Sequence, residues 1–235
     1  GESELGVVAY NTSAAGVTRF NIEAISTTDS PLDDLRHHKA IRDDDWKGRV
    51  VPAYRPDPVT DPDFEGFAAN VAKLGEMTGE DTASWKGYLR ALAIRRELFK
   101  TLGCTSTDHG HPTARTSDLA EAQCQALLTK ALKGGLAPEQ AEEFRGQLLT
   151  EMVGMSRDDG LVIQIHPGSH RNHNQPLFAG WGRDVGADIP SPTEYVSALK
   201  PLLNKYGNET GVSVIVFTLD ETSYSRELAP LSGHY

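Results

Sequence analysis

Charged or imidazole side chains follow each of five short apolar, β-branched runs in the sequence. They are, in chain order, Asp29, Arg55, the pair Asp108 and His109, His166 and Asp220. In a parallel α/β barrel the carboxyl ends of the strands meet on one face, and active sites are built there from several strands. We therefore expect one shared pocket. The alternative, that such residues cap helices or face water, weighs most for Asp29 and Asp220.

The segment Asp108-His109-Gly110-His111 places a carboxylate and two imidazoles around a glycine. This composition suits a backbone held close to a ligand or metal. Alternate residues of a strand point to one face, so the two histidines could converge if the strand continued. Because Gly110 and Pro112 indicate a turn, we predict that His109 points inward and that His111 is a loop residue.

Residues 166–174 contain three histidines, one arginine and two asparagines, which is more polar donors than a connecting loop requires. Arg171 suits a planar carboxylate, because a guanidinium can donate two parallel charge-assisted hydrogen bonds. Asn172 can bind sugar hydroxyls. We predict that this segment binds a ligand, with a solvated loop as the alternative.

Arg55 precedes Pro56, which disfavours a helical conformation at Arg55 and holds it extended beyond its strand. It can therefore project over the mouth of a barrel. A surface ion pair with Asp57 is the alternative. His37 and His38 lie in a charged stretch, and we expect them on the solvated face of a helix.

The elements that must position these residues form an alternation of strands and helices. We predict buried strands at residues 20–27, 49–54, 103–107, 161–165 and 212–218. Capping residues and prolines mark four helix starts, at Ser30-Pro31, at Asp118 with Glu121, at Pro138, and at Ser191-Pro192-Thr193-Glu194. This alternation implies a parallel sheet with right-handed crossovers, in one α/β domain over residues 1–235.

The composition of the chain favours a small-molecule ligand. The 235 residues carry a formal net charge of −10, and no Lys/Arg cluster is available to neutralise the phosphates of a nucleic acid. Cys104 and Cys124 lack metal-type spacing, so we expect buried free thiols in a reducing compartment. No run is apolar and long enough to cross a bilayer and no signal segment is evident, so we expect a cytoplasmic protein without a membrane partner.

Five motifs, in the same order and at comparable spacing, resemble the uronate isomerases of the amidohydrolase superfamily. They are Thr27-Thr28-Asp29-Ser30-Pro31, Tyr54-Arg55-Pro56-Asp57, Thr107-Asp108-His109-Gly110, the segment from Gln164-Ile165-His166 to Arg171-Asn172-His173-Asn174, and Phe217-Thr218-Leu219-Asp220. The resemblance runs from about Arg19 to the end, nearest the bacterial glucuronate isomerases. Residues 1–18 show no resemblance.

The resemblance implies a distorted (β/α)8 TIM-type barrel, of which this chain would form strands two to six. It implies interconversion of D-glucuronate with D-fructuronate, and of D-galacturonate with D-tagaturonate. Arg55 would bind the substrate carboxylate, His109 would line the pocket, and His166 would lie nearest a divalent metal, with zinc as the first candidate. Arg171 and Asn172 would face the substrate, and Asp220 would end strand six near the pocket.

The family's metal ligands, a His-x-His pair on the first strand and a proton-transferring aspartate on the eighth, do not occur in this sequence. We therefore expect a uronate isomerase fragment that is inactive by itself. The alternatives are a metal-dependent hydrolase of the same superfamily and a non-catalytic sugar-acid-binding domain. Because an incomplete barrel leaves two sheet edges unpaired, we also expect self-association.

Overall fold

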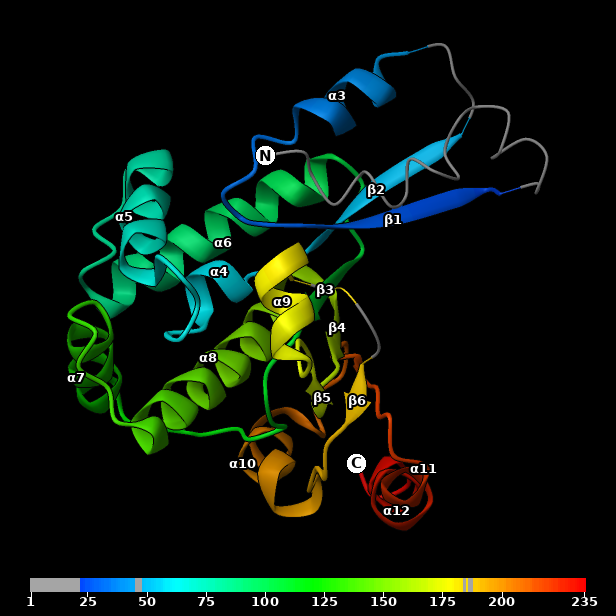
Figure 1. Cartoon of the computed structure of the whole chain (residues 1–235). Coiled ribbons are helices and arrows are strands. Elements are labelled where there is room, and N and C mark those ends of the chain that lie inside the picture. Colours follow the sequence, from blue (N-terminus) through cyan, green and yellow to red (C-terminus); the bar gives the residue numbers. More distant parts are fainter. Residues whose placement is uncertain (1–21, 45–47, 184, 186–187) are drawn as a thin grey trace.

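The computed structural model describes residues 22–44, 48–183, 185 and 188–235 of the chain. Strands alternate with helices along these residues (Figure 1). The strands are β1 (Ala24–Asp29), β2 (Arg49–Tyr54), β3 (Ser106–His109), β4 (Val162–Ile165), β5 (Ser169–His170), β6 (Ile189–Pro190) and β7 (Val214–Val216). The helices are α3 (Arg36–Arg42), α4 (Asp57–Thr60), α5 (Phe67–Thr78), α6 (Trp85–Thr101), α7 (Glu121–Ala131), α8 (Pro138–Asp159), α9 (Gln175–Trp181), α10 (Val196–Tyr206), α11 (Glu221–Ser223) and α12 (Ala229–Ser232), with a π-helical turn, Tyr224–Leu228, before the last.

A five-stranded parallel sheet in the order β1-β2-β3-β4-β7 forms the frame of the molecule. This confirms the five predicted strands and their parallel arrangement. The register pairs Asp29 with Tyr54, and His109 with Ile165. The carboxyl ends of neighbouring strands therefore lie along one edge of the sheet, as in a barrel.

The strand limits differ from the predicted ones by a few residues. β1 continues to Asp29 and β3 to His109, so both of these polar residues end a strand instead of following it. β7 is shorter, ending at Val216. Residues 20 and 21 of the first predicted run lie outside the described residues. The short antiparallel pair β5–β6 was not predicted, because a two-residue strand carries no periodic signal.

Helices α5 to α8 gather on one side of the sheet, and their apolar faces form the core against it (Figure 1). Leu92 and Phe99 of α6 and Phe144 and Leu148 of α8 are fully buried. Arg96 is also fully buried, since its guanidinium pairs with Asp159 of α8 at 2.6 Å. Charge pairing of this kind lets a long cationic side chain lie inside a core.

Three of the four predicted helix starts are wrong in detail, and each has a local reason. Ser30 makes a turn with Leu32, and α3 begins only at Arg36, after Leu35 adopts a left-handed φ of 55°. At α7 the side chain of Gln123 caps the backbone of Ala120.

Before α10, Glu194 accepts hydrogen bonds from the backbone of Ser197 and Ala198, so the helix begins at Val196 instead of at Pro192. The start at Pro138 is confirmed. Side-chain caps compete with one another, and the sequence alone does not rank them. None of the described helices is long and apolar enough to cross a membrane.

Candidate active site

Six polar side chains converge where β2, β3 and β4 end, and we call them the strand-end cluster. They are Arg55, Asp57, Asp108, His109, His111 and His166. Parallel register brings the ends of these three strands together, although the residues lie far apart in the sequence. The expected convergence of polar strand ends is therefore seen at three strands, and a shared pocket there stays a prediction.

Arg55 connects two carboxylates of the strand-end cluster. Its Nε lies 2.9 Å from Asp57 Oδ2, and one terminal nitrogen lies 3.4 Å from Asp108 Oδ2. Its side chain is 26% exposed, whereas those carboxylates are 13% and 12% exposed. The ion pair with Asp57 that we considered as the alternative does form, but it is largely buried. It orients the guanidinium at the edge of the sheet instead of tying it to the surface.

Asp108 and His166 form a carboxylate–imidazole pair. His166 Nε2 is hydrogen-bonded to Asp108 Oδ1, and the histidine side chain is 24% exposed. The backbone N–H of His166 also donates to the carbonyl of His109 at 3.1 Å, which holds the start of its loop against β3. An imidazole oriented by a carboxylate and open to solvent can accept and return a proton.

A side chain at Gly110 would force its neighbours to move. A Cβ atom there would lie 2.7 Å from a terminal nitrogen of Arg55 and 2.9 Å from Asp57 Oδ2. It would also lie 3.3 Å from Cε1 of His166. The backbone N–H of Gly110 donates to the Asp57 carboxylate at 3.3 Å. Glycine at this position thus allows Arg55, Asp57 and His166 to approach the backbone closely.

His109 and His111 are both buried, with 1% and 5% of their surface exposed. Their rings meet edge to face with centroids 5.9 Å apart. Thr107 Oγ1 lies 2.9 Å from Nε2 of His109. Thr107 pairs with Tyr54, which packs against α6, so His109 shares the face of β3 that is turned to this helix, and its role in a pocket wall stays a prediction. His111 lies beyond β3, as expected for a loop residue, yet it is as enclosed as a core residue.

Burial controls the ionisation of this histidine pair. Burial, and then the neighbouring His111, lowers the pKa of His109 well below its usual value. Burial also lowers the pKa of His111. Both rings are therefore neutral near pH 7. Neither ring nitrogen of His111 has a hydrogen-bond partner in the described part of the chain. Asp57, His109 and His111 each offer a donor atom within 4.8 Å of the others.

The first predicted strand end, Asp29, has local partners instead. It accepts a hydrogen bond from Thr27 at 2.6 Å and lies 3.5 Å from His38. Burial raises the pKa of its carboxyl group. His38 is only 3% exposed, so the prediction that it lies on a solvated face is wrong, while His37 is exposed. The contacts with Thr27 and Asp29 hold the imidazole of His38 against β1.

The last predicted strand end, Asp220, acts as a helix cap. Its Oδ1 accepts hydrogen bonds from the backbone and hydroxyl of Thr222, and its Oδ2 accepts one from Ser223. These hydrogen bonds lower the pKa of Asp220. The alternative considered for this residue, a capping role, is therefore seen in the structure.

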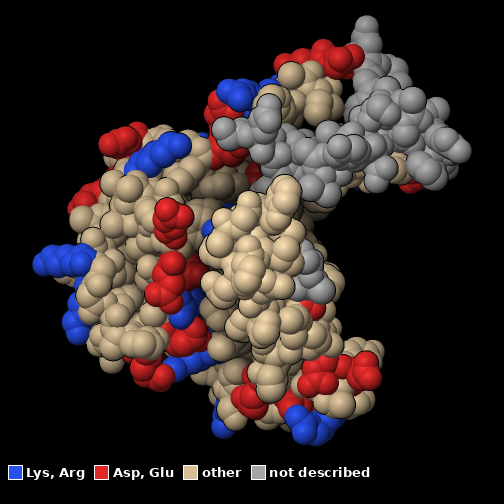
Figure 2. All heavy atoms as spheres, viewed as in Figure 1, with Lys and Arg blue, Asp and Glu red and all other residues tan. Residues whose placement is uncertain are grey.

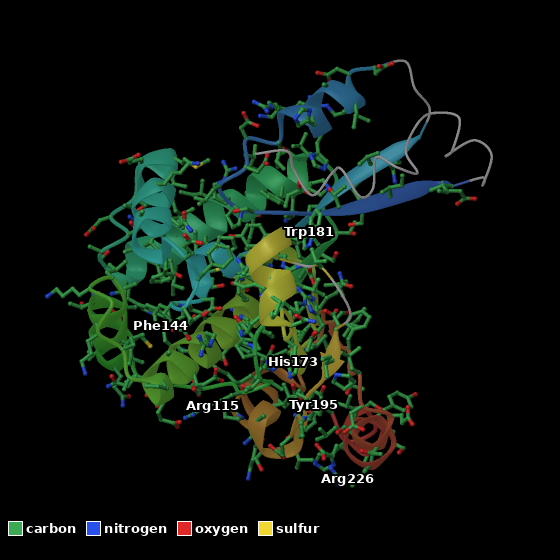
Figure 3. The ribbon with its side chains drawn as sticks, in the orientation of Figure 1. Arg115, Phe144, His173, Trp181, Tyr195 and Arg226 are labelled. Atoms are coloured by element: carbon green, nitrogen blue, oxygen red, sulfur yellow. The ribbon has the colours of Figure 1, made fainter. Side chains whose placement is uncertain are left out.

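The segment of residues 169–174, which we call the histidine loop, is mostly exposed. Arg171 pairs with Asp188 at 3.3 Å, and the two side chains are 39% and 51% exposed. Asn172 has a left-handed φ of 55°. The rings of His170 and His173 meet edge to face with centroids 5.2 Å apart. His173 lies near one end of α9 and Trp181 near the other (Figure 3).

Asp57 and His111 are the members of the strand-end cluster that we underestimated. Asp57 was considered only as a surface partner for Arg55, but α4 turns it back against the end of β3. The prolines on either side of Asp57 were a signal for a turn there. Nothing in the sequence shows that the turn would bring Asp57 to His111.

A parallel barrel-type sheet with polar side chains at neighbouring strand ends places the chain in the TIM-barrel class of folds. The chain belongs to the glucuronate isomerase family, whose family model matches residues 9–235. This match begins before Arg19, where we expected the resemblance to start.

Relatives support the same assignment. The chain is 64% identical over 217 residues to a uronate isomerase of Phenylobacterium zucineum, covering 92% of this chain and 45% of the relative. It is 62% identical to a uronate isomerase of Xanthomonas oryzae pv. oryzae, covering 92% of this chain and 46% of the relative. The chain therefore spans slightly less than half the length of these curated relatives.

Solved structures show that the architecture is shared. The crystal structure of glucuronate isomerase from Caulobacter crescentus matches with a TM-score of 0.90 and 56% identity, over 95% of this chain and 47% of that chain. Uronate isomerase from Thermotoga maritima matches with a TM-score of 0.87 and 27% identity, over 94% and 49%. The five-stranded sheet is thus part of the TIM-type barrel of this family.

Proposed function

We propose that this chain forms the sugar-acid-recognition part of a uronate isomerase, which interconverts D-glucuronate and D-fructuronate by aldose–ketose isomerisation. The observation that carries the proposal is the continuous chain of contacts from Arg55 through Asp108 to His166, across three adjacent strand ends of this family's fold. It combines a carboxylate-binding group with a proton-transferring group at one edge.

Arg55 is the proposed clamp for the uronate carboxylate. Its side chain is partly exposed, and Asp57 and Asp108 fix the orientation of the guanidinium. Arginine recognises a planar carboxylate through paired, charge-assisted hydrogen bonds, for which orientation matters. Arg171 and Asn172 remain proposed substrate-facing residues of the histidine loop, His109 a proposed pocket wall, and Asp220 a residue near the pocket.

His166 and Asp108 supply the proton chemistry that this chain contains. The isomerisation transfers a proton from C2 to C1 through an enediol, and the hydroxyl protons must also move between O1 and O2. An imidazole held by a carboxylate can take a hydroxyl proton from one oxygen and return it to the other. His166 is the proposed shuttle, and Asp108 orients it.

The resemblance also implies a divalent metal ion, with zinc as the first candidate and His166 as the residue nearest to it. The ligands that it implies on the first and eighth barrel strands do not occur in this sequence. His166 as the residue nearest a metal stays a proposal, and in the structure it contacts Asp108. The proposed transfer of the hydroxyl proton between O1 and O2 therefore involves only His166 and Asp108 of this chain.

Calorimetric titration of the chain with D-glucuronate, with and without added zinc, tests the recognition role. We expect binding that weakens about tenfold or more in Arg55→Met, because charge-assisted hydrogen bonds are lost. Arg42→Met, at an exposed ion pair on α3, is the matched control. Equal binding by the Arg55 and Arg42 variants would contradict the clamp.

A coupled assay for fructuronate tests the chemical step. We expect no turnover by this chain alone, because the proton-transferring aspartate that the resemblance implies is not in its sequence. Turnover by the pure chain would overturn that expectation. A non-catalytic sugar-acid-binding domain would be favoured by two results together. Glucuronate binding would depend on Arg55 and not on zinc, and a longer protein that contains this chain would show no turnover.

We also infer that the chain self-associates. In the described residues β1 and β7 each pair on one side only, and such edges can pair with another chain. Light scattering of the purified chain should show dimers or larger species. A monodisperse monomer would count against this inference.

A further inference from the structure

We propose that Asp57, His109 and His111 bind a divalent transition-metal ion, preferentially zinc. This site differs from the ligand set that the family resemblance implies, which comes from other strands. The proposal does not depend on the proposed isomerase function, because it concerns binding of an ion by this chain itself.

The donor set has the chemistry of a transition-metal site. One carboxylate oxygen and two imidazole nitrogens lie within 4.8 Å of one another. Two histidines and a carboxylate suit zinc and neighbouring transition metals, whereas magnesium and calcium prefer oxygen donors throughout. Three protein ligands would leave a fourth position for water or another small ligand.

His111 gives independent support for the site. It is 5% exposed, and neither of its ring nitrogens has a hydrogen-bond partner in the described residues. Buried polar groups in folded proteins are nearly always partnered, so such a side chain calls for an explanation. A metal ion held with Asp57 and His109 supplies the missing partner.

The other two donors are already held in place by outer contacts. Asp57 accepts hydrogen bonds from Arg55 Nε at 2.9 Å and from Gly110 N–H at 3.3 Å. A carboxylate has about four lone-pair positions, so these contacts leave it able to accept another bond. Thr107 Oγ1 fixes the ring of His109 at 2.9 Å. Outer contacts of this kind orient the ligands of natural metal sites.

Only a modest contraction is needed to close the site. Zinc bound tetrahedrally at about 2.0–2.1 Å holds its donor atoms roughly 3.4 Å apart. The donors here lie within 4.8 Å, and side-chain rotations can bring them together. The cluster also joins strand ends β2 and β3, so the ion would tie these strands at the same edge as Arg55 and His166.

The competing zinc ligands are His170 and His173 of the histidine loop. Their rings are 5.2 Å apart and the residues are exposed, so they could collect zinc adventitiously. The proposed site is buried and includes a carboxylate, whereas the histidine pair of the loop is exposed. Zinc binding by variants at each site distinguishes the two.

Calorimetry of the metal-free chain with ZnCl2 provides the direct test. We expect one strong site per chain with a Kd in the micromolar range or tighter, which a hundredfold excess of Mg²⁺ does not displace. His111→Asn should weaken zinc binding at least a hundredfold, and Thr107→Val about tenfold, since loss of an outer contact costs roughly 10–100-fold in affinity. The double variant His170→Asn/His173→Asn and the exposed control His234→Asn should bind zinc like the parent chain.

Cobalt substitution provides a second readout that does not depend on activity. Co²⁺ in the site should give visible absorption bands that His111→Asn abolishes and His234→Asn retains. Circular dichroism establishes whether each variant is folded; if His111→Asn is not, Thr107→Val and Asp57→Asn provide the comparison. The proposal would be overturned if the parent chain did not bind zinc. It would also be overturned if the histidine-loop double variant lost zinc binding while His111→Asn kept it.

Discussion

The strand-end cluster and the histidine loop are built from the same residue types, yet the structure treats them differently. The cluster residues Asp57, His109 and His111 are nearly inaccessible, and their donor atoms lie within 4.8 Å of one another. In the histidine loop Arg171 and its partner Asp188 are both exposed. The difference teaches that a density of polar donors in a sequence is weaker evidence for a preorganised site than convergence from several strands.

Support from the sheet explains the difference. The cluster follows central strands of the five-stranded sheet, of which β3 and β4 pair over four residues. The histidine loop is anchored by β5 and β6, which pair over only two residues each. The loop leads into α9. This helix carries no charged residue, and its surface is uncharged beside acidic side chains (Figure 2). A loop with so little support is suited to adjust to a ligand instead of presenting a rigid site.

Replacing the arginine of each region with methionine should give the largest difference in the free energy of unfolding. Arg55→Met leaves the carboxylates of Asp57 and Asp108 largely buried without their cation, and breaking a buried pair costs about 3–5 kcal/mol. Because Arg55 is partly exposed, we expect a loss of about 2–3 kcal/mol in the free energy of unfolding. Arg171→Met should cost less than about 1 kcal/mol.

Urea denaturation followed by circular dichroism measures both arginine variants. Equal losses of stability in the two would remove the distinction between a buried cluster and a solvated loop. The m-value should stay that of the parent chain in each variant, since neither substitution changes the surface exposed on unfolding.

Adding one methyl group in each region should give an intermediate contrast. Gly110→Ala places a Cβ atom 2.7 Å from Arg55 and 2.9 Å from Asp57, which should destabilise the fold by about 1–3 kcal/mol. Gly180→Ala in α9 meets no atom within 4 Å and should stabilise that helix by about 0.5–1 kcal/mol. Thermal unfolding of the two variants should shift in opposite directions; a stabilised Gly110 variant would show that the cluster is loosely packed.

The smallest effect should come from Asp220, which lies outside the strand-end cluster. Hydrogen bonds lower its pKa in the folded state, so its ionised form contributes stability that is complete above the unfolded pKa of 3.8 and is lost as the pH falls through the lowered pKa. Asp220→Asn keeps the capping acceptor without the titration. Unfolding measured from about pH 5 down to about pH 2 should show the small advantage of the parent chain disappearing. An advantage that grows as the pH falls would contradict the capping role.

Much of the fold was predictable because it rests on local periodicity. The runs that became β2 and β4, and the helix start at Pro138, are visible as apolar patterns and a proline. Helix α3 was misplaced, because Ser30 made a turn where a cap was expected. His38 was misassigned for a similar reason: its partners, Thr27 and Asp29, come from another element.

The site was predictable in part. Arg55, Asp108 and His166 were identified because parallel topology alone places strand ends together. The contribution of Asp57 and the burial of His111 were not, since they depend on how α4 folds back onto the end of β3.

The sequence by itself determined the family, the order of the strands and the residues that end them, because motifs and periodicity are properties of the chain read in order. Only the tertiary structure decided which of those residues meet. Asp220 and Asp29 found local partners, whereas Arg55, Asp108 and His166 joined across strands. The physical reason is that a buried charge must find a partner near enough to replace water, and the packing of the elements determines which partner that is.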